Sequence, residues 1–92
     1  MSNSTNNINN TVVVSNLSFN VAEGHLKEIF ETYGKVEDVK LAKNKFGHSL
    51  QWALITYETT EMVEEAINYL NGGQIDGLTI TVRKPDPNID IL

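Results

Sequence analysis

Six segments with the hydrophobic spacing of strands and helices follow one another between residues 11 and 83, and their order constrains the fold more than any other feature. Apolar residues with a period of two are typical of strands, whereas apolar residues three and four apart indicate an amphipathic helix. The expected elements, in order, are a strand at Thr11–Ser15, a helix at Val21–Tyr33, strands at Val36–Leu41 and Trp52–Tyr57, a helix that Thr59 or Thr60 caps and that Asn71 ends, and, after a short hairpin, a strand at Leu78–Arg83.

This order, β-α-β-β-α-β, is that of the split βαβ or ferredoxin-like arrangement, an α+β fold. Right-handed crossovers place both helices on one face of a four-stranded antiparallel sheet. We expect Gly34 to end the first helix in a left-handed conformation. The second face of the sheet stays open, so the residues that point to it are the first candidates for function.

The two ends of the chain differ in composition from the segments between them. Met1–Asn10 consists almost entirely of Asn, Ser and Thr, so we expect a disordered lead-in over residues 1–10. Pro85 and Pro87 end regular structure. The expected organisation is therefore one domain over residues 11–84, followed by a C-terminal tail over residues 85–92.

Composition and charge argue against several classes of function. The chain has no cysteine, and its two histidines, His25 and His48, fall in different segments without an obvious acidic partner. We therefore expect no enzyme, no catalytic residue, no metal site and no cofactor. No apolar run is long enough to span a membrane. The net charge of −5 argues against a general polyanion binder, so nucleic-acid binding would depend on a local basic patch and on stacking.

Alternation assigns the strand residues to the two faces of the sheet. The residues expected to point away from the helices are Val13, Ser15, Lys40, Ala42, Trp52, Leu54, Thr56, Thr79, Thr81 and Arg83. Trp52 is the most informative, because an exposed indole offers a flat surface on which an unpaired base stacks, at about 1–3 kcal/mol per base. Lys40 and Arg83 flank it and would meet phosphates. The alternative is that the apolar end of the tail, with Ile89, Ile91 and Leu92, folds back over Trp52.

The loop that joins the second and third strands carries two lysines, Lys43 and Lys45, and one ring, Phe46. One interpretation is that the loop wraps a strand of RNA, with Phe46 as a second stacking ring. The other is a hairpin tip with Phe46 tucked against the sheet edge. Tyr33 and Tyr69 lie at or near the apolar stripes of the helices, which indicates a packing role.

Four stretches of the chain resemble the RNA recognition motif family. Val12–Leu17 is similar to its RNP2 hexamer, Leu50–Tyr57 is in register with its RNP1 octamer, and Ile29–Val36 and Leu70–Gly77 match the family closely. The resemblance covers about residues 11–84. It departs from the family at the three usual stacking positions, which here are Val13, Trp52 and Leu54, and at the basic and glycine residues that open RNP1, which here are Leu50 and Gln51.

The resemblance implies binding of single-stranded RNA on the open sheet face, with modest affinity. Within the family, the Thr-Tyr-Gly-Lys and Gly-Gly-Gln-Ile-Asp-Gly stretches look like the serine-rich-domain protein of the ASAP complex, and the Val-Ser-Asn-Leu and Gly-His-Ser-Leu stretches look like ALY/REF-type mRNA-export adaptors. Both point to nuclear mRNA processing or export, with the cytoplasm as an additional location. We expect the domain to be a monomer. The candidate RNA-binding residues are Val13, Ser15, Lys40, Lys43, Lys45, Phe46, Trp52, Leu54, Thr56, Thr81, Arg83 and Lys84.

A protein-interaction domain is the second hypothesis, because acidic residues gather on the two helices. They are Glu23, Glu28 and Glu31 on the first helix and Glu58, Glu61, Glu64 and Glu65 around the second. Such a face either keeps a small domain soluble or meets a basic segment of a nuclear mRNA-processing protein. Both alternatives remain open at the level of the sequence.

Overall fold

A computed structural model describes residues 10–85 of the 92-residue chain. The elements are β1 (Thr11–Ser15), α1 (Glu23–Phe30), a 3-10 turn η2 (Glu31–Tyr33), β2 (Val36–Lys43), β3 (Ser49–Tyr57), α2 (Thr60–Leu70), β4 (Gln74–Ile75), β5 (Leu78–Thr79) and β6 (Thr81–Arg83). The expectations of a disordered lead-in before Asn10 and of a tail that covers Trp52 lie outside the described residues.

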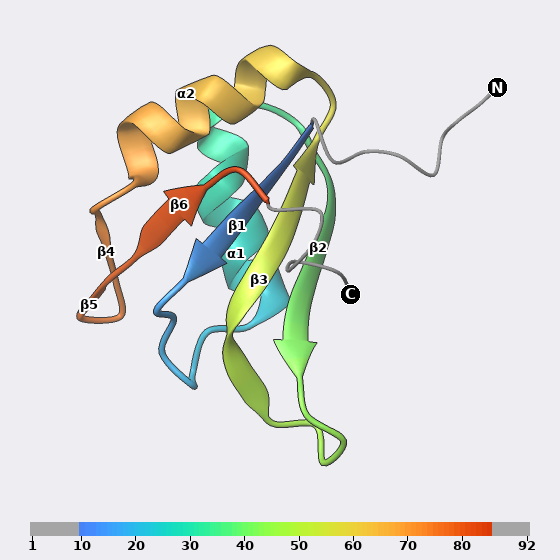
Figure 1. The fold of residues 1–92 in the computed structure, drawn as a ribbon, viewed down its shortest axis with the longest axis vertical. Coiled ribbons are helices and arrows are strands. Elements are labelled where there is room, and N and C mark those ends of the chain that lie inside the picture. Colours follow the sequence, from blue (N-terminus) through green and yellow to red (C-terminus); the bar gives the residue numbers. More distant parts are fainter. Residues whose placement is uncertain (1–9, 86–92) are drawn as a thin grey trace, which may run out of the picture.

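Four strands form one antiparallel sheet in the order β2-β3-β1-β6. Both helices cover the same face of this sheet, and the opposite face carries no helix (Figure 1). The predicted α+β, ferredoxin-like fold is therefore confirmed. Among the described residues, no helix is long and apolar enough to cross a membrane.

The predicted last strand is interrupted. β4 and β5 form a separate two-stranded hairpin, and Ile80 breaks the strand between β5 and β6. Ile80 donates its N–H to the Gly73 carbonyl oxygen at 2.8 Å and accepts a hydrogen bond from the Gly72 N–H at 3.0 Å. The hairpin turn consists of Asp76 and Gly77, both with positive φ (55° and 84°), as a two-residue type I′ turn requires.

The core lies between the sheet and the helices. It contains the inward residues that alternation predicts, with Val12, Ala53 and Ile55 fully buried and Val39 and Leu41 packed against them in part. Tyr57 is buried with them, and its hydroxyl donates a 2.7 Å hydrogen bond to the Phe30 carbonyl oxygen at the end of α1. This bond ties the end of β3 to the junction between α1 and η2.

The helix ends differ from the prediction. Gly34 has φ 156° and ψ 165°, so it is not the left-handed cap that we expected. A Cβ atom at this position would overlap the side chain of Met62 on α2, so the glycine allows close approach of two segments. The expected cap of α2 is also wrong, because Thr59 occupies the N-cap position without a side-chain hydrogen bond.

The start of α2 is held by Asn10 instead. The Thr60 hydroxyl donates to the Asn10 Oδ1 at 2.9 Å, and the Asn10 Nδ2 donates to the Glu58 carbonyl oxygen at 3.2 Å. Asn10, which the composition assigned to the lead-in, therefore already belongs to the folded domain.

Candidate nucleic-acid interface

Strand register arranges the residues of the helix-free sheet face in three rows. The middle row runs from edge to edge through Lys40, Leu54, Val13 and Arg83. Trp52, Ser15 and Thr81 form the row on one side of it, toward the start of β3. Asp38, Thr56 and Thr11 form the row on the other side.

Trp52 lies half-buried in its row, opposite Ser15. It lines a shallow hollow of about 510 Å³ together with Val13, Ser15, Asn16, Leu50, Gln51 and Arg83. The sequence predicted that Lys40 and Arg83 flank Trp52. Arg83 lines this hollow, and Lys40 does not. The half-exposed indole in an open depression has the shape and chemistry that a stacked base needs.

Val13 and Ala42 are less accessible than the open-face assignment predicts. Their exposed fractions are 1% and 2%, although neither belongs to the core cluster on the helix side. Val13 lies in an inner strand between the longer side chains of Leu54 and Arg83. The aliphatic residue at the second RNP2 position therefore lies beneath the surface, and Leu54 at the fifth RNP1 position is half-buried.

The charges on this face are few and unevenly placed. Lys40 and Arg83 lie at opposite edges of the middle row, and both are exposed. The Arg83 Nη1 donates to the Lys84 carbonyl oxygen at 3.1 Å. Lys84, a predicted RNA contact, has its Nζ 2.7 Å from the Glu64 Oε2 of α2, so its charge is paired toward the helical side. Ser15 is half-buried and lines the hollow, and Thr81, which pairs with Ser15, is exposed.

Asp38 is a member of this face that the sequence reasoning missed. The register moves from Val36–Tyr57 to Asp38–Thr56, so Glu37 is an extra residue and a bulge reverses the alternation. The signal was available, because Val36 and Val39 are three residues apart and not two. Thr56 in the same row faces Thr11, with their hydroxyl oxygens 3.2 Å apart. The carboxylate makes this end of the face unfavourable for a phosphate.

Gln51, next to Trp52, has a φ of 71° although it lies within β3. Here the register moves from Leu41–Ala53 to Lys43–Ser49, so two residues of β2 face four of β3. Gln51 accepts a hydrogen bond from the Leu17 N–H at 2.9 Å, and its Nε2 donates to the Leu17 carbonyl oxygen at 3.0 Å. The bulged start of β3 is thereby tied to the loop after β1.

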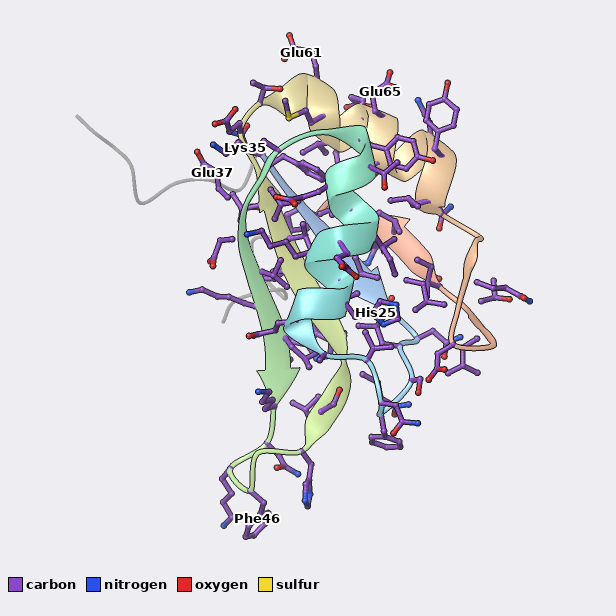
Figure 2. The ribbon with its side chains drawn as sticks, turned by 180° about the vertical axis from the view of Figure 1, so that it is seen from behind. His25, Lys35, Glu37, Phe46, Glu61 and Glu65 are labelled. Atoms are coloured by element: carbon purple, nitrogen blue, oxygen red, sulfur yellow. The ribbon has the colours of Figure 1, made fainter. Side chains whose placement is uncertain are left out.

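The hairpin between β2 and β3 projects away from the body of the domain (Figure 1), and Phe46 lies at its tip (Figure 2). Phe46 is 72% exposed, so the interpretation that it is tucked against the sheet edge is wrong. The Lys45 Nζ lies 5.3 Å from the centre of its ring, and the His48 ring lies 6.4 Å from it. The Asn44 Oδ1 accepts from the N–H groups of Phe46 and His48, which shapes the tip.

The helical side carries acidic residues and one aromatic pair. Glu61 and Glu65 project from α2 in Figure 2. The rings of Tyr33 and Tyr69 are parallel, with centres 5.4 Å apart and an interplanar angle of 2°. Tyr33 is half-buried and Tyr69 is 64% exposed, so the packing role predicted for them leaves much of one ring accessible.

A buried ionisable group of the core, Tyr57, has a shifted pKa. Burial raises the pKa of the Tyr57 hydroxyl well above its usual value, and the nearby Tyr33 adds to the effect. Across residues 10–85 no group of three His, Cys, Asp or Glu residues is placed to hold a metal ion.

Comparison with known proteins agrees with this geometry. The family model described as the RNA recognition motif matches residues 12–81. The chain belongs to the RNA recognition motif family. Among curated proteins it is similar to the RNA-binding protein with serine-rich domain 1 of Danio rerio, with 36% identity over 67 residues. That match covers 71% of this chain and 24% of the relative, so the chain spans about a quarter of that protein's length.

Solved structures show the same fold at lower identity. The RNA-binding protein PG1 superimposes with a TM-score of 0.79 at 22% identity, over 82% of this chain and 92% of that one. The RNA recognition domains 1 and 2 of Sex-lethal from Drosophila melanogaster give a TM-score of 0.80 at 20% identity, over 86% and 51% of the two chains. The recognition motif of RNA15 gives 0.79 at 19% identity, over 86% and 92%.

Proposed function

We propose that this domain binds single-stranded RNA on its helix-free sheet face, with Trp52 as the central stacking surface, and acts as a monomer in nuclear mRNA processing or export. The observation that carries the proposal is the half-exposed Trp52 indole in the hollow that it shares with Arg83. The similarity to a relative named for RNA binding supports the ligand class. The nuclear role rests on that same similarity.

The geometry favours weak binding that tolerates different sequences. Only one of the three usual stacking positions carries a ring, and the other two, Val13 and Leu54, are buried or half-buried. A base stacked on Trp52 would place its phosphates toward Lys40 or Arg83, since Asp38 lies in the row at the far end. Two or three phosphate contacts predict a slope of log K against log salt of only about −1.4 to −2.1, at about 0.7 per contact.

Replacement of the indole tests the proposal. We expect Trp52→Ala to weaken binding of a labelled trinucleotide by about 1–3 kcal/mol, or about five- to 150-fold, as measured by fluorescence anisotropy. Tyr69→Ala is the matched control, because it removes another exposed ring on the helical side of the domain. Equal affinity of the Trp52→Ala variant and the unmodified domain would contradict the proposal, provided that circular dichroism shows both to be folded.

A second candidate function is protein binding through the helical side. The observation that favours it is the Tyr33–Tyr69 stack beside α2, a helix that carries Glu61, Glu64 and Glu65 and no basic residue. An aromatic surface among carboxylates suits an arginine-containing segment, because a guanidinium both stacks on rings and pairs with carboxylates.

Amide chemical shifts separate the two candidates. Addition of short RNA should shift amides around Trp52 and Arg83, and addition of an arginine-rich peptide from a nuclear protein should shift those of α2 and η2. RNA-induced shifts that are confined to α2 would contradict the sheet-face proposal. The two functions use opposite sides of the domain, so both sets of shifts in one sample would support both.

A further inference from the structure

The two outer strands of the sheet leave edges to which another strand can add. β2 lies at one edge and β6 at the other (Figure 1). An edge strand presents N–H and C=O groups that have no partner strand, and proteins commonly protect such an edge from pairing with another chain. In this domain the two edges are protected to different degrees.

The β6 edge is short, and its outward N–H groups are bonded within the domain. β6 has three residues, and the Val82 N–H donates to the Asn71 Oδ1 at 2.9 Å. Just before β6, the Ile80 N–H donates to the Gly73 carbonyl oxygen at 2.8 Å. The segment that follows α2 therefore closes this edge.

The β2 edge is longer and is held at one point. β2 has eight residues, and the Leu41 N–H donates to the Glu23 Oε2 at 3.0 Å. In an antiparallel pair, alternate residues turn both backbone groups away from the neighbouring strand, so Val39 turns them outward as Leu41 does. Glu23 is the one side chain that bonds the backbone of this edge in the described part of the chain.

Glu23 is the first residue of α1, and it reaches the edge from the helix side of the sheet. Two shallow hollows, of about 260 Å³ and 450 Å³, lie along β2, and Glu23 lines both. A carboxylate in the first turn is also stabilised by the helix dipole, so its position alone does not establish a role at the edge. The bond to Leu41 does, because the carboxylate oxygen lies where the carbonyl oxygen of an added strand would accept this N–H.

The charges on β2 suit a second copy of the same strand. Asp38 and Lys40 both lie on the helix-free face, on either side of Val39. Neither forms an ion pair within residues 10–85. When two copies of β2 pair antiparallel with Val39 opposite Val39, Asp38 of each copy faces Lys40 of the other. Opposite charges directly across two strands stabilise their pairing, and like charges destabilise it.

The neighbouring registers do not pair opposite charges in this way. Val39 opposite Leu41 brings Lys40 opposite Lys40, and Leu41 opposite Leu41 leaves Lys40 opposite Ala42. In the favoured register, the Leu41 N–H of each copy turns toward residue 37 of the other copy. Because the Glu23 carboxylate already accepts this N–H, it competes directly with the second strand.

We propose that β2 is a self-association edge, to which a second copy of the domain adds antiparallel about Val39, and that the Glu23 carboxylate keeps this edge closed. The inference does not rest on RNA binding. While Glu23 accepts the Leu41 N–H, the domain is a monomer. Loss of this bond allows the four-stranded sheets of two copies to join along β2.

Sedimentation velocity over a range of concentrations tests the role of Glu23. Each copy gives up its bond to Leu41 on pairing, so Glu23→Ala should lower the dimer dissociation constant about five- to 150-fold, the equivalent of two hydrogen bonds. Glu23→Gln keeps an oxygen acceptor and should stay close to the unmodified domain. Glu28→Ala is the matched control, because it removes another exposed carboxylate of α1.

Charge exchange on the Glu23→Ala background tests the register. Asp38→Lys should abolish the dimer, because it places lysine opposite lysine. The further change Lys40→Asp should restore the dimer with the charges exchanged. Hydrogen exchange of the Val39 amide should slow in the dimer, because this N–H then donates to the second copy. Restoration also distinguishes a specific dimer from aggregation of a partly unfolded variant, and circular dichroism checks that each variant is folded.

Three outcomes would overturn the proposal. A folded Glu23→Ala variant that stays monomeric over the whole concentration range would show that β2 does not self-associate. A Glu23→Ala dimer that Asp38→Lys leaves intact would exclude pairing about Val39. Dimerisation of the unmodified domain as strong as that of Glu23→Ala would refute the role of the carboxylate.

Discussion

Gln51 offers a quantitative test of how the start of β3 is stabilised. Its φ of 71° lies in the left-handed region of backbone conformation. This region costs roughly 1–2 kcal/mol for a residue with a Cβ atom. Against this cost, its Nε2 donates a hydrogen bond to the Leu17 carbonyl oxygen, which contributes about 0.5–1.5 kcal/mol. The two effects are similar in size, so replacements that remove one or both of them give different results.

Gln51→Ala removes the hydrogen bond and keeps the strain, so we expect it to lower the free energy of unfolding by about 0.5–1.5 kcal/mol. Gln51→Gly removes both. Because glycine costs about 0.5–1 kcal/mol in chain entropy, the gain over Gln51→Ala should be about 0.5–1 kcal/mol. We therefore expect the unmodified domain and Gln51→Gly to be about equally stable, and Gln51→Ala to be less stable than both.

Urea unfolding measures these differences, with the fluorescence of Trp52, the sole tryptophan of the chain, as the probe. Asp76 is the matched control, because it also has positive φ, at 55°, and lies exposed in a turn. The difference between Asp76→Ala and Asp76→Gly reports the conformational effect without a hydrogen bond to Leu17. A Gln51→Gly variant less stable than Gln51→Ala would refute the strain argument. A Gln51→Ala variant as stable as the unmodified domain would refute the value assigned to the hydrogen bond.

Two further predictions concern stability. Tyr57→Phe should cost about 0.5–1.5 kcal/mol, because it removes the buried hydrogen bond from the Tyr57 hydroxyl to the Phe30 carbonyl oxygen. Since the pKa of Tyr57 is raised in the folded state, the unmodified domain should lose stability as pH rises above about 10, and Tyr57→Phe should flatten this loss in denaturation curves at increasing pH. Gly34→Ala should lower the melting temperature, since its Cβ would overlap Met62. Gly24→Ala lies in open space within α1, so it should raise the melting temperature and add about 0.5–1 kcal/mol of stability. A Gly34→Ala variant that melts above the Gly24→Ala variant would contradict the roles given to the two glycines.

The order of elements could be predicted from the sequence because hydrophobic periodicity is a local property. Trp52, Ala53 and Ile55 reveal their faces by alternation alone, and the fold followed from the order of strands and helices. The same logic fails where strand pairing, and not local sequence, decides the register. The spacing of Val36 and Val39 already indicates the bulge at Glu37, but the two extra residues of β3 beside Gln51 become apparent only from the pairing of β2 with β3.

The candidate site was less predictable than the fold, because side-chain partners come from distant segments. Lys84 reads as a cation beside the sheet until α2 supplies Glu64. Val13 alternates onto the helix-free face, but it is only 1% exposed there, between the longer side chains of Leu54 and Arg83 that the neighbouring strands supply.

The uneven charge of the sheet face bears on how an acidic domain would bind RNA. With a net charge of −5, long-range attraction cannot bring the strand to the domain, so affinity would depend on contacts made after encounter. Asp38 disfavours phosphates at one end of the face, and the Trp52 hollow lies toward the other. Stacking on a ring tolerates any base, whereas the repulsion between the Asp38 carboxylate and the phosphates depends on where the phosphates lie on the face. The face would therefore restrict the path of the strand more strongly than its sequence.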